Sequence, residues 1–61
     1  MSLQTYKSRF SGDIIKALVR AANELQESFF IVSIDFDVNT CENVYTVEAS
    51  EEFHLKATSY L

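Results

Sequence analysis

The sequence predicts a small α+β domain in which one amphipathic helix packs on an antiparallel sheet. Hydrophobic residues recur at a helical spacing across residues 12–28, and they recur with a period of two across 29–38 and 44–49. The length points the same way, because 61 residues suffice for only one domain, which spans 1–61. The expected order of elements is β-α-β-β, followed by a C-terminal segment that is either helix or strand.

Residues 12–28 are expected to form the helix. Ser11 is the expected N-cap, and Asp13 lies in the first turn, where a negative charge suits the helix dipole. At about 100° per residue, hydrophobic residues fall on one side of this helix, and Ile15 and Val19 widen that side. The members of this side are Ile14, Leu18, Ala21, Ala22, Leu25 and Phe29. The remaining charges oppose the dipole, so packing must hold this helix in place.

Residues 29–38 and 44–49 are expected to form a hairpin around a four-residue loop at 39–42. The first strand presents one entirely apolar face, formed by Phe30, Val32, Ile34, Phe36 and Val38. The second presents Tyr45, Val47 and Ala49 on one face. Matching these two faces fixes the register, because a slip of one residue would invert a strand. The match places Phe36 opposite Tyr45 and Ile34 opposite Val47. Asp35 then faces Thr46 and Asp37 faces Val44, so no like charges meet.

The two ends of the chain are ambiguous. Residues 3–10 fit a strand, which we favour, or a helical lead-in. Residues 50–61 fit a helix, which we favour, with Glu51 and Glu52 in its first turn, or a third strand. A two-stranded hairpin on one helix is only marginally stable. The edge of the strand at 29–38 must therefore be filled either by the N-terminal segment or by another chain.

Charge is distributed unevenly along the chain. Residues 1–20 hold four bases and one acid, a net of +3, whereas residues 21–55 hold eight acids and no Lys or Arg, a net of −8. Lys56 brings the total to −4. Such polarity can steer a basic partner or pair two copies head to tail. The acidic balance argues against direct binding of nucleic acid, which requires Lys and Arg to replace phosphate counterions.

Composition favours association. A chain this short buries only about 60% of its unfolded surface and usually needs a disulfide, a metal or another subunit. Cys41 is the only cysteine and His54 the only histidine, so neither an internal disulfide nor a four-ligand zinc site is expected. With 48% hydrophobic and 13% aromatic residues, the chain is expected to complete its fold as a homodimer. The residues expected in the core or dimer interface are Phe29, Phe30, Ile31, Val32, Ile34, Phe36 and Phe53.

The sequence gives no sign of membrane insertion or secretion. No segment approaches the roughly 18 apolar residues of a membrane span, and residues 1–20 lack the hydrophobic stretch of a secretory signal. The expected location is therefore the cytoplasm, with no membrane partner.

Candidates for catalysis are weak. Asp35, Asp37 and Glu48 share a predicted strand face, but such a face offers neither a pocket that separates two carboxylate pKa values nor the six to eight oxygens that calcium requires. Cys41 and His54 have no third residue to orient them as a nucleophilic pair, so they are expected to be an incidental loop thiol and a surface histidine. No catalytic residue, metal or cofactor is expected.

These observations favour a non-enzymatic protein-interaction module, a homodimeric adaptor or regulator that presents an acidic surface to a basic partner. The residues expected to contact that partner are Asp35, Asp37, Glu48, Glu51 and Glu52. The alternative is an inhibitor or regulator of a nucleic-acid-handling protein, with carboxylates standing in for phosphates. An enzyme would require a site built across a dimer, for instance from Cys41 or His54 of two copies.

Overall fold

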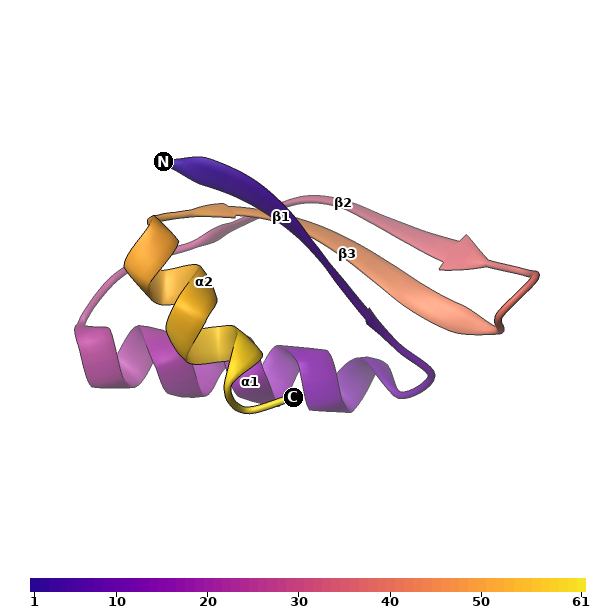
Figure 1. Ribbon diagram of the computed structural model, residues 1–61, viewed down its shortest axis with the longest axis horizontal. Coiled ribbons are helices and arrows are strands. Elements are labelled where there is room, and N and C mark those ends of the chain that lie inside the picture. Colours follow the sequence, from indigo (N-terminus) through magenta and orange to yellow (C-terminus); the bar gives the residue numbers. More distant parts are fainter.

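The computed structural model describes residues 1–61 as a three-stranded antiparallel sheet with two helices on one of its faces (Figure 1). In chain order the elements are β1 (Ser2–Ser8), α1 (Ser11–Leu25), β2 (Phe30–Asp37), β3 (Glu42–Ala49) and α2 (Glu51–Thr58). The α+β class and the β-α-β-β order are confirmed. Of the open alternatives, the N-terminal segment is a strand and the C-terminal segment a helix. Neither helix is long and apolar enough to cross a membrane.

Helix α1 buries the side that its periodicity predicts. Ile14, Leu18 and Ala21 are fully buried, while Ile15 and Val19, at the margin of the apolar side, stay nearly half exposed. The expected Ser11 cap is wrong: Ser11 is already helical, because the Asp13 amide donates to the Phe10 carbonyl one turn earlier. Phe10 makes no side-chain cap, so packing rather than capping holds this end of the helix.

The central strand of the sheet is β3, because the strand order is β1-β3-β2. The pairing of β1 with β3 runs from Ser2 opposite Ala49 to Ser8 opposite Asn43 and takes up the whole of that edge. The N-terminal segment therefore does not fill the edge of β2, which was one of the two alternatives that the sequence left. The second edge of β2 has no strand beside it.

The hairpin register differs from the expected one by two residues. Ile34 pairs with Tyr45 and Phe36 pairs with Asn43, around a loop at 38–41 rather than 39–42. The reason is that β3 begins at Glu42 rather than at residue 44, while an irregularity between Ile31 and Ser33 shifts the pairing farther along β2.

In the observed register Asp37 faces Glu42, whereas the expected register set it opposite Val44 with no like charges facing each other. Lys7 offsets this repulsion, because its ammonium lies 3.8 Å from the Asp37 carboxylate. The loop is closed by Cys41, whose φ of 58° places it in the left-handed region.

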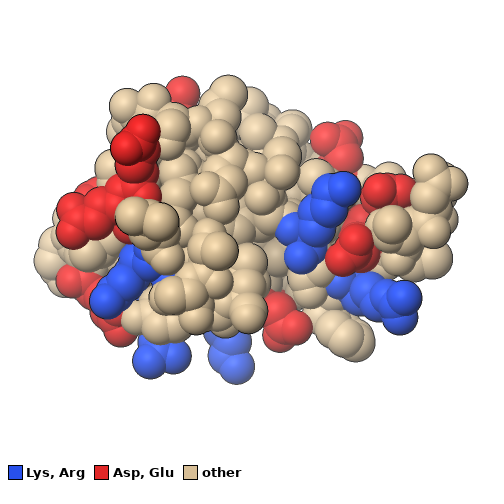
Figure 2. Space-filling view, viewed as in Figure 1, with Lys and Arg blue, Asp and Glu red and all other residues tan.

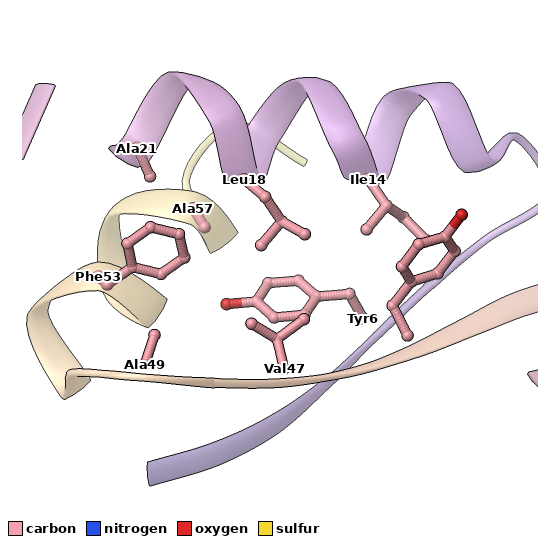
Figure 3. Packing of buried hydrophobic residues seen from close by; sticks show 9 residues of the cluster. Tyr6, Ile14, Leu18, Ala21, Val47, Ala49, Phe53 and Ala57 are labelled. Carbon is pink, nitrogen blue, oxygen red and sulfur yellow. The ribbon is translucent and has the colours of Figure 1, made fainter. Parts of the chain in front are cut away.

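The hydrophobic core lies between the helices and strands β1 and β3 (Figure 3). Figure 3 shows Leu18 of α1 and Phe53 of α2 directed toward Val47 of β3, with the Tyr6 ring between the layers. The nine buried residues of this core are Tyr6, Ile14, Leu18, Ala21, Tyr45, Val47, Ala49, Phe53 and Ala57. None of them comes from β2. The helices therefore cover two strands of the sheet and leave the third without a share of the core.

Candidate interaction surface

Strand β2 is the most apolar strand of the sheet and also the least buried. Every residue from Phe30 to Phe36 is exposed, and its five large apolar side chains keep between 42% and 60% of their surface in contact with solvent. Those side chains are Phe30, Ile31, Val32, Ile34 and Phe36. Isolated exposed hydrophobic residues are common on protein surfaces, but a contiguous strand of them marks an interaction site.

The exposed side chains occupy both faces of the strand. Residues paired across an antiparallel sheet project from the same face, so Ile31 and Ile34, which pair with the buried Val47 and Tyr45, lie on the face that carries the helices. Phe36 lies on this inner face too, two residues beyond Ile34. The helices do not reach that far across the sheet, so the inner face of β2 stays open.

The open surface continues from β2 onto α1. Glu24 marks the side of α1 that faces α2, because its carboxylate lies 3.5 Å from the Lys56 ammonium. At about 100° per residue, Ile15 and Val19 lie on nearly the opposite side of the helix. Since α2 lies beside β1, that opposite side of α1 is directed toward the β2 edge.

We refer to these exposed apolar residues together as the β2 surface: Ile15, Val19, Phe30, Ile31, Val32, Ile34 and Phe36. Two residues expected in the core or interface are separated from it by the fold. Phe53 is completely buried, and Phe29 is half-buried against it, with ring centroids 5.3 Å apart. The other five expected residues, 30–32, 34 and 36, all belong to the β2 surface.

The five carboxylates expected to bind a partner lie on two different parts of the molecule. Asp35, Asp37 and Glu48 project from the outer face of the sheet, opposite the helices. Glu51 and Glu52 are exposed in the first turn of α2. Asp37 is additionally engaged by Lys7, which leaves Asp35 as the carboxylate on β2 without an ion-pair partner.

Folding also mixes charges that the sequence separates. Arg20 from the basic segment lies 3.6 Å from Glu24, and Lys56 contacts the same carboxylate. Figure 2 shows Lys and Arg next to Asp and Glu at both ends of the molecule, with a broad uncharged area between them. On this face of the folded protein, acids and bases therefore lie closer together than their order along the chain indicates.

A buried polar cluster that the sequence did not indicate joins α2 to β1. His54 is only 4% exposed, so the interpretation of it as a surface histidine is wrong. Its Nδ1 lies 2.6 Å from the Tyr6 hydroxyl and its Nε2 lies 2.9 Å from the Ser2 carbonyl oxygen. A carbonyl only accepts, so Nε2 carries the proton and Nδ1 accepts from Tyr6.

This cluster is structural in character. Both ring nitrogens of His54 are engaged by the fold, and no buried side-chain nitrogen or oxygen lacks a hydrogen-bond partner. The position of His54 could have been suspected from its place beside Phe53 and three residues before Ala57, both on the buried side of α2. The identity of its partner Tyr6, 48 residues away, could not.

Cys41 and His54 do not meet within one chain. Cys41 is exposed in the β2–β3 loop, next to the first residue of β3, while His54 lies in the helix that follows the last residue of β3. A strand of eight residues separates its ends by about 23 Å. The structure also brings no three His, Cys, Asp or Glu side chains together in a way that could hold a metal ion.

Comparison with known proteins adds no further information. The chain matches no family model, and neither a curated protein nor a solved structure shows detectable similarity to it. The features that bear on function are therefore the β2 surface and the charges around it.

The hydrogen bond between Tyr6 and His54 generates a prediction about stability. Tyr6→Phe removes the donor to a buried nitrogen, so urea unfolding at pH 7 should show a loss of about 1–3 kcal/mol. Burial raises the pKa of the Tyr6 phenol, so its contribution is complete below the ordinary tyrosine pKa of about 10 and is lost as the pH rises through the higher folded value. As the pH rises through this higher value, the free energy of unfolding should therefore fall less in the variant than in the wild type.

Tyr60→Phe is the matched control. Its hydroxyl donates to the exposed Glu24 carboxylate, which raises the pKa of Tyr60 as well, but no buried atom loses a partner when this hydroxyl is removed. The loss at pH 7 should be smaller than for Tyr6→Phe. Equal losses of unfolding free energy in the two variants would show that the buried Tyr6–His54 hydrogen bond stabilises the fold no more than the exposed Tyr60–Glu24 one.

Proposed function

We propose that this protein is a small, non-enzymatic interaction module that works as a homodimeric adaptor or regulator, with the β2 surface buried by a second copy. The observation that carries the proposal is the exposure of β2, a strand with apolar side chains on both faces and an unpaired edge. Unprotected edges of this kind template pairing with another chain. Asp35 and Asp37 are the only charges on this strand, and its other residues, apart from Ser33, are large hydrophobic ones.

The exposed apolar area approaches that of a subunit interface. Seven large side chains, each about half exposed, present on the order of 600–700 Å² of apolar surface, since even aromatic side chains offer only 150–250 Å² each. A standard protein–protein interface buries about 800 Å² on each partner, whereas the largest apolar patch on a typical monomer covers about 300–600 Å². The β2 surface thus falls between an exceptional patch and an ordinary interface, and it dominates a small molecule.

The small core of a single copy supports the same proposal. Only 11 of the 61 residues are buried in a single copy, so the core available to hold the sheet together is small. Burying the β2 surface would extend this core across the whole sheet at about 25 cal/mol per Å². A homodimer of this kind resembles one core divided between two subunits.

We further propose that the dimer presents its carboxylates to a basic partner. Asp35 and Glu48 project from the outer face of the sheet, away from the helices, and Glu51 and Glu52 are exposed on α2. Burial of the β2 surface at the inner face and the edge would leave these groups in solvent. The free, exposed thiol of Cys41 suits a reducing compartment, which supports a cytoplasmic location as part of this proposal.

Sedimentation equilibrium tests the homodimer. The expected result is a species with twice the 7.0 kDa mass of one chain at micromolar concentrations. Ile34→Lys should shift the equilibrium to the single chain by at least tenfold in dissociation constant, because it places a charge in the buried contact. Leu55→Lys, on an exposed side chain of α2 outside the β2 surface, is the control and should not change the mass. A wild-type protein that remains a single, cooperatively unfolding chain at high concentration would overturn the proposal.

Binding of a lysine-rich peptide, followed by fluorescence polarisation at several salt concentrations, tests the basic partner. Glu48→Gln, on the central strand and away from the β2 edge, should weaken binding and flatten its dependence on salt, because a charge that steers the encounter is removed. Asp13→Asn removes one exposed charge from the first turn of α1, outside the proposed set, and should have the smaller effect. Equal effects of the two variants would mean that only net charge matters and would contradict the assignment of this face.

A further inference from the structure

We infer that the two copies join edge to edge through β2, which pairs antiparallel with its counterpart around a two-fold axis at Ile34 and makes one six-stranded sheet. This inference rests on the proposed homodimer and specifies how it is built. The sheet order of the assembly would be β1-β3-β2 followed by β2-β3-β1 of the second copy. Such pairing satisfies the backbone groups of the open β2 edge and buries its side chains in the same step.

The other exposed edge of the sheet, β1, is less suited to this role. Its inner face is already covered, because Tyr6 is buried under the helices and the Gln4 amide donates to the Thr58 hydroxyl of α2 at 3.0 Å. It also carries Lys7, and a lysine on an edge strand discourages pairing with another chain. The large apolar side chains of the sheet that lack cover are concentrated on β2.

Charge selects the register. A two-fold axis perpendicular to the sheet makes the central residue of the pairing face its own copy. Centring on Asp35 or Asp37 would press two identical carboxylates together, and centring on Phe36 would place Asp35 against the Asp37 of the other copy. Among centres in the regular part of the strand, residues 33–37, only Ser33 or Ile34 keeps both carboxylates of β2 opposite uncharged residues.

Geometry then favours Ile34 over Ser33. The pairing of β2 with β3 is regular from Ser33 to Asp37 and irregular between Ile31 and Ser33. A centre at Ile34 sets regular segments side by side, with Asp35 of each copy opposite Ser33 of the other. The serine hydroxyl can donate to that carboxylate. A centre at Ser33 would instead set the irregular part of one strand against Ile34 and Asp35 of the other.

The inner faces of the two copies would then close over each other. The two β3 strands would lie three strand spacings apart, about 14 Å. Since α1 packs over β3 through Leu18 and Val47 (Figure 3), the two α1 helices would be separated by a similar distance, compared with 8–10 Å for helices in direct contact. The gap is about the width of one layer of side chains, which Ile34 and Phe36 from the sheet and Ile15 and Val19 from α1 would fill.

Oxidative cross-linking in a Cys41→Ser background tests this arrangement. Residues directly opposite in an antiparallel pair have Cα atoms about 4.5–5.5 Å apart, within the range that a disulfide spans. Ile34→Cys should therefore form a cross-linked dimer rapidly under mild oxidation, as judged on a non-reducing gel. Denaturant should abolish the rapid reaction, because it separates the two copies.

Val38→Cys in the same background is the control. Val38 is 74% exposed, more than Ile34, so random collisions would favour it. In the proposed register the two copies of residue 38 lie about 26 Å apart, since each is four residues from the axis at about 3.3 Å per residue. Its cross-linking should be at least tenfold slower than that of Ile34→Cys.

The outcomes separate the two proposals. A wild-type dimer with preferential cross-linking at position 34 supports both. A wild-type dimer in which position 38 reacts as fast as position 34, or in which position 34 does not react, overturns the edge-to-edge arrangement while the homodimer stands. A wild-type protein that sediments as a single chain overturns both, and the β2 surface would then belong to a different protein.

Discussion

The placement of α2 under β1 determines which side of this molecule stays open. Phe53 enters the shared core, and His54 is held from both ring nitrogens, by the Tyr6 hydroxyl and the Ser2 carbonyl. These contacts commit the second helix to the β1 edge of the sheet. Helix α1 then covers the middle of the sheet, and no element of the chain remains to cover β2.

The rest of the structure follows from this asymmetry. A chain of 61 residues has few ways to increase its stability, and here one edge strand keeps exposed apolar side chains on both faces with no helix packed over it. An exposed apolar edge promotes aggregation of a solitary domain, whereas in an assembly it can bind the strand of a partner. The acids Asp35 and Asp37 lie at the hairpin end of the strand, where they limit the registers in which it can pair with itself.

Much of the fold could be predicted because it depends on local periodicity. The helical spacing of Ile14, Leu18 and Ala21 locates α1, and alternation locates the faces of the hairpin strands. Alternation assigns faces but not neighbours, so it could not show that β1 pairs with β3 rather than with β2. It also cannot reveal the irregularity between Ile31 and Ser33, which arises from pairing between strands.

The candidate site was predictable in part for the same reason. The apolar run at 29–36 was visible in the sequence, yet sequence alone could not separate core from interface. That separation depends on where the helices lie: Phe53 is buried and Phe29 packs against it, while Ile34 and Phe36 remain open. His54 was missed because a buried histidine requires partners, and both of its partners are distant in sequence.

Amide hydrogen exchange of β2, followed by NMR at low and high protein concentration, would show whether the open edge of this strand binds a second copy. In a single copy, alternate amides of Phe30–Asp37 point toward the unpaired edge and should exchange as fast as those of an exposed loop. At concentrations where two copies associate, these same amides should become protected by at least tenfold, because each gains a strand partner. Exchange of the edge amides that is equally fast at both concentrations would contradict the account.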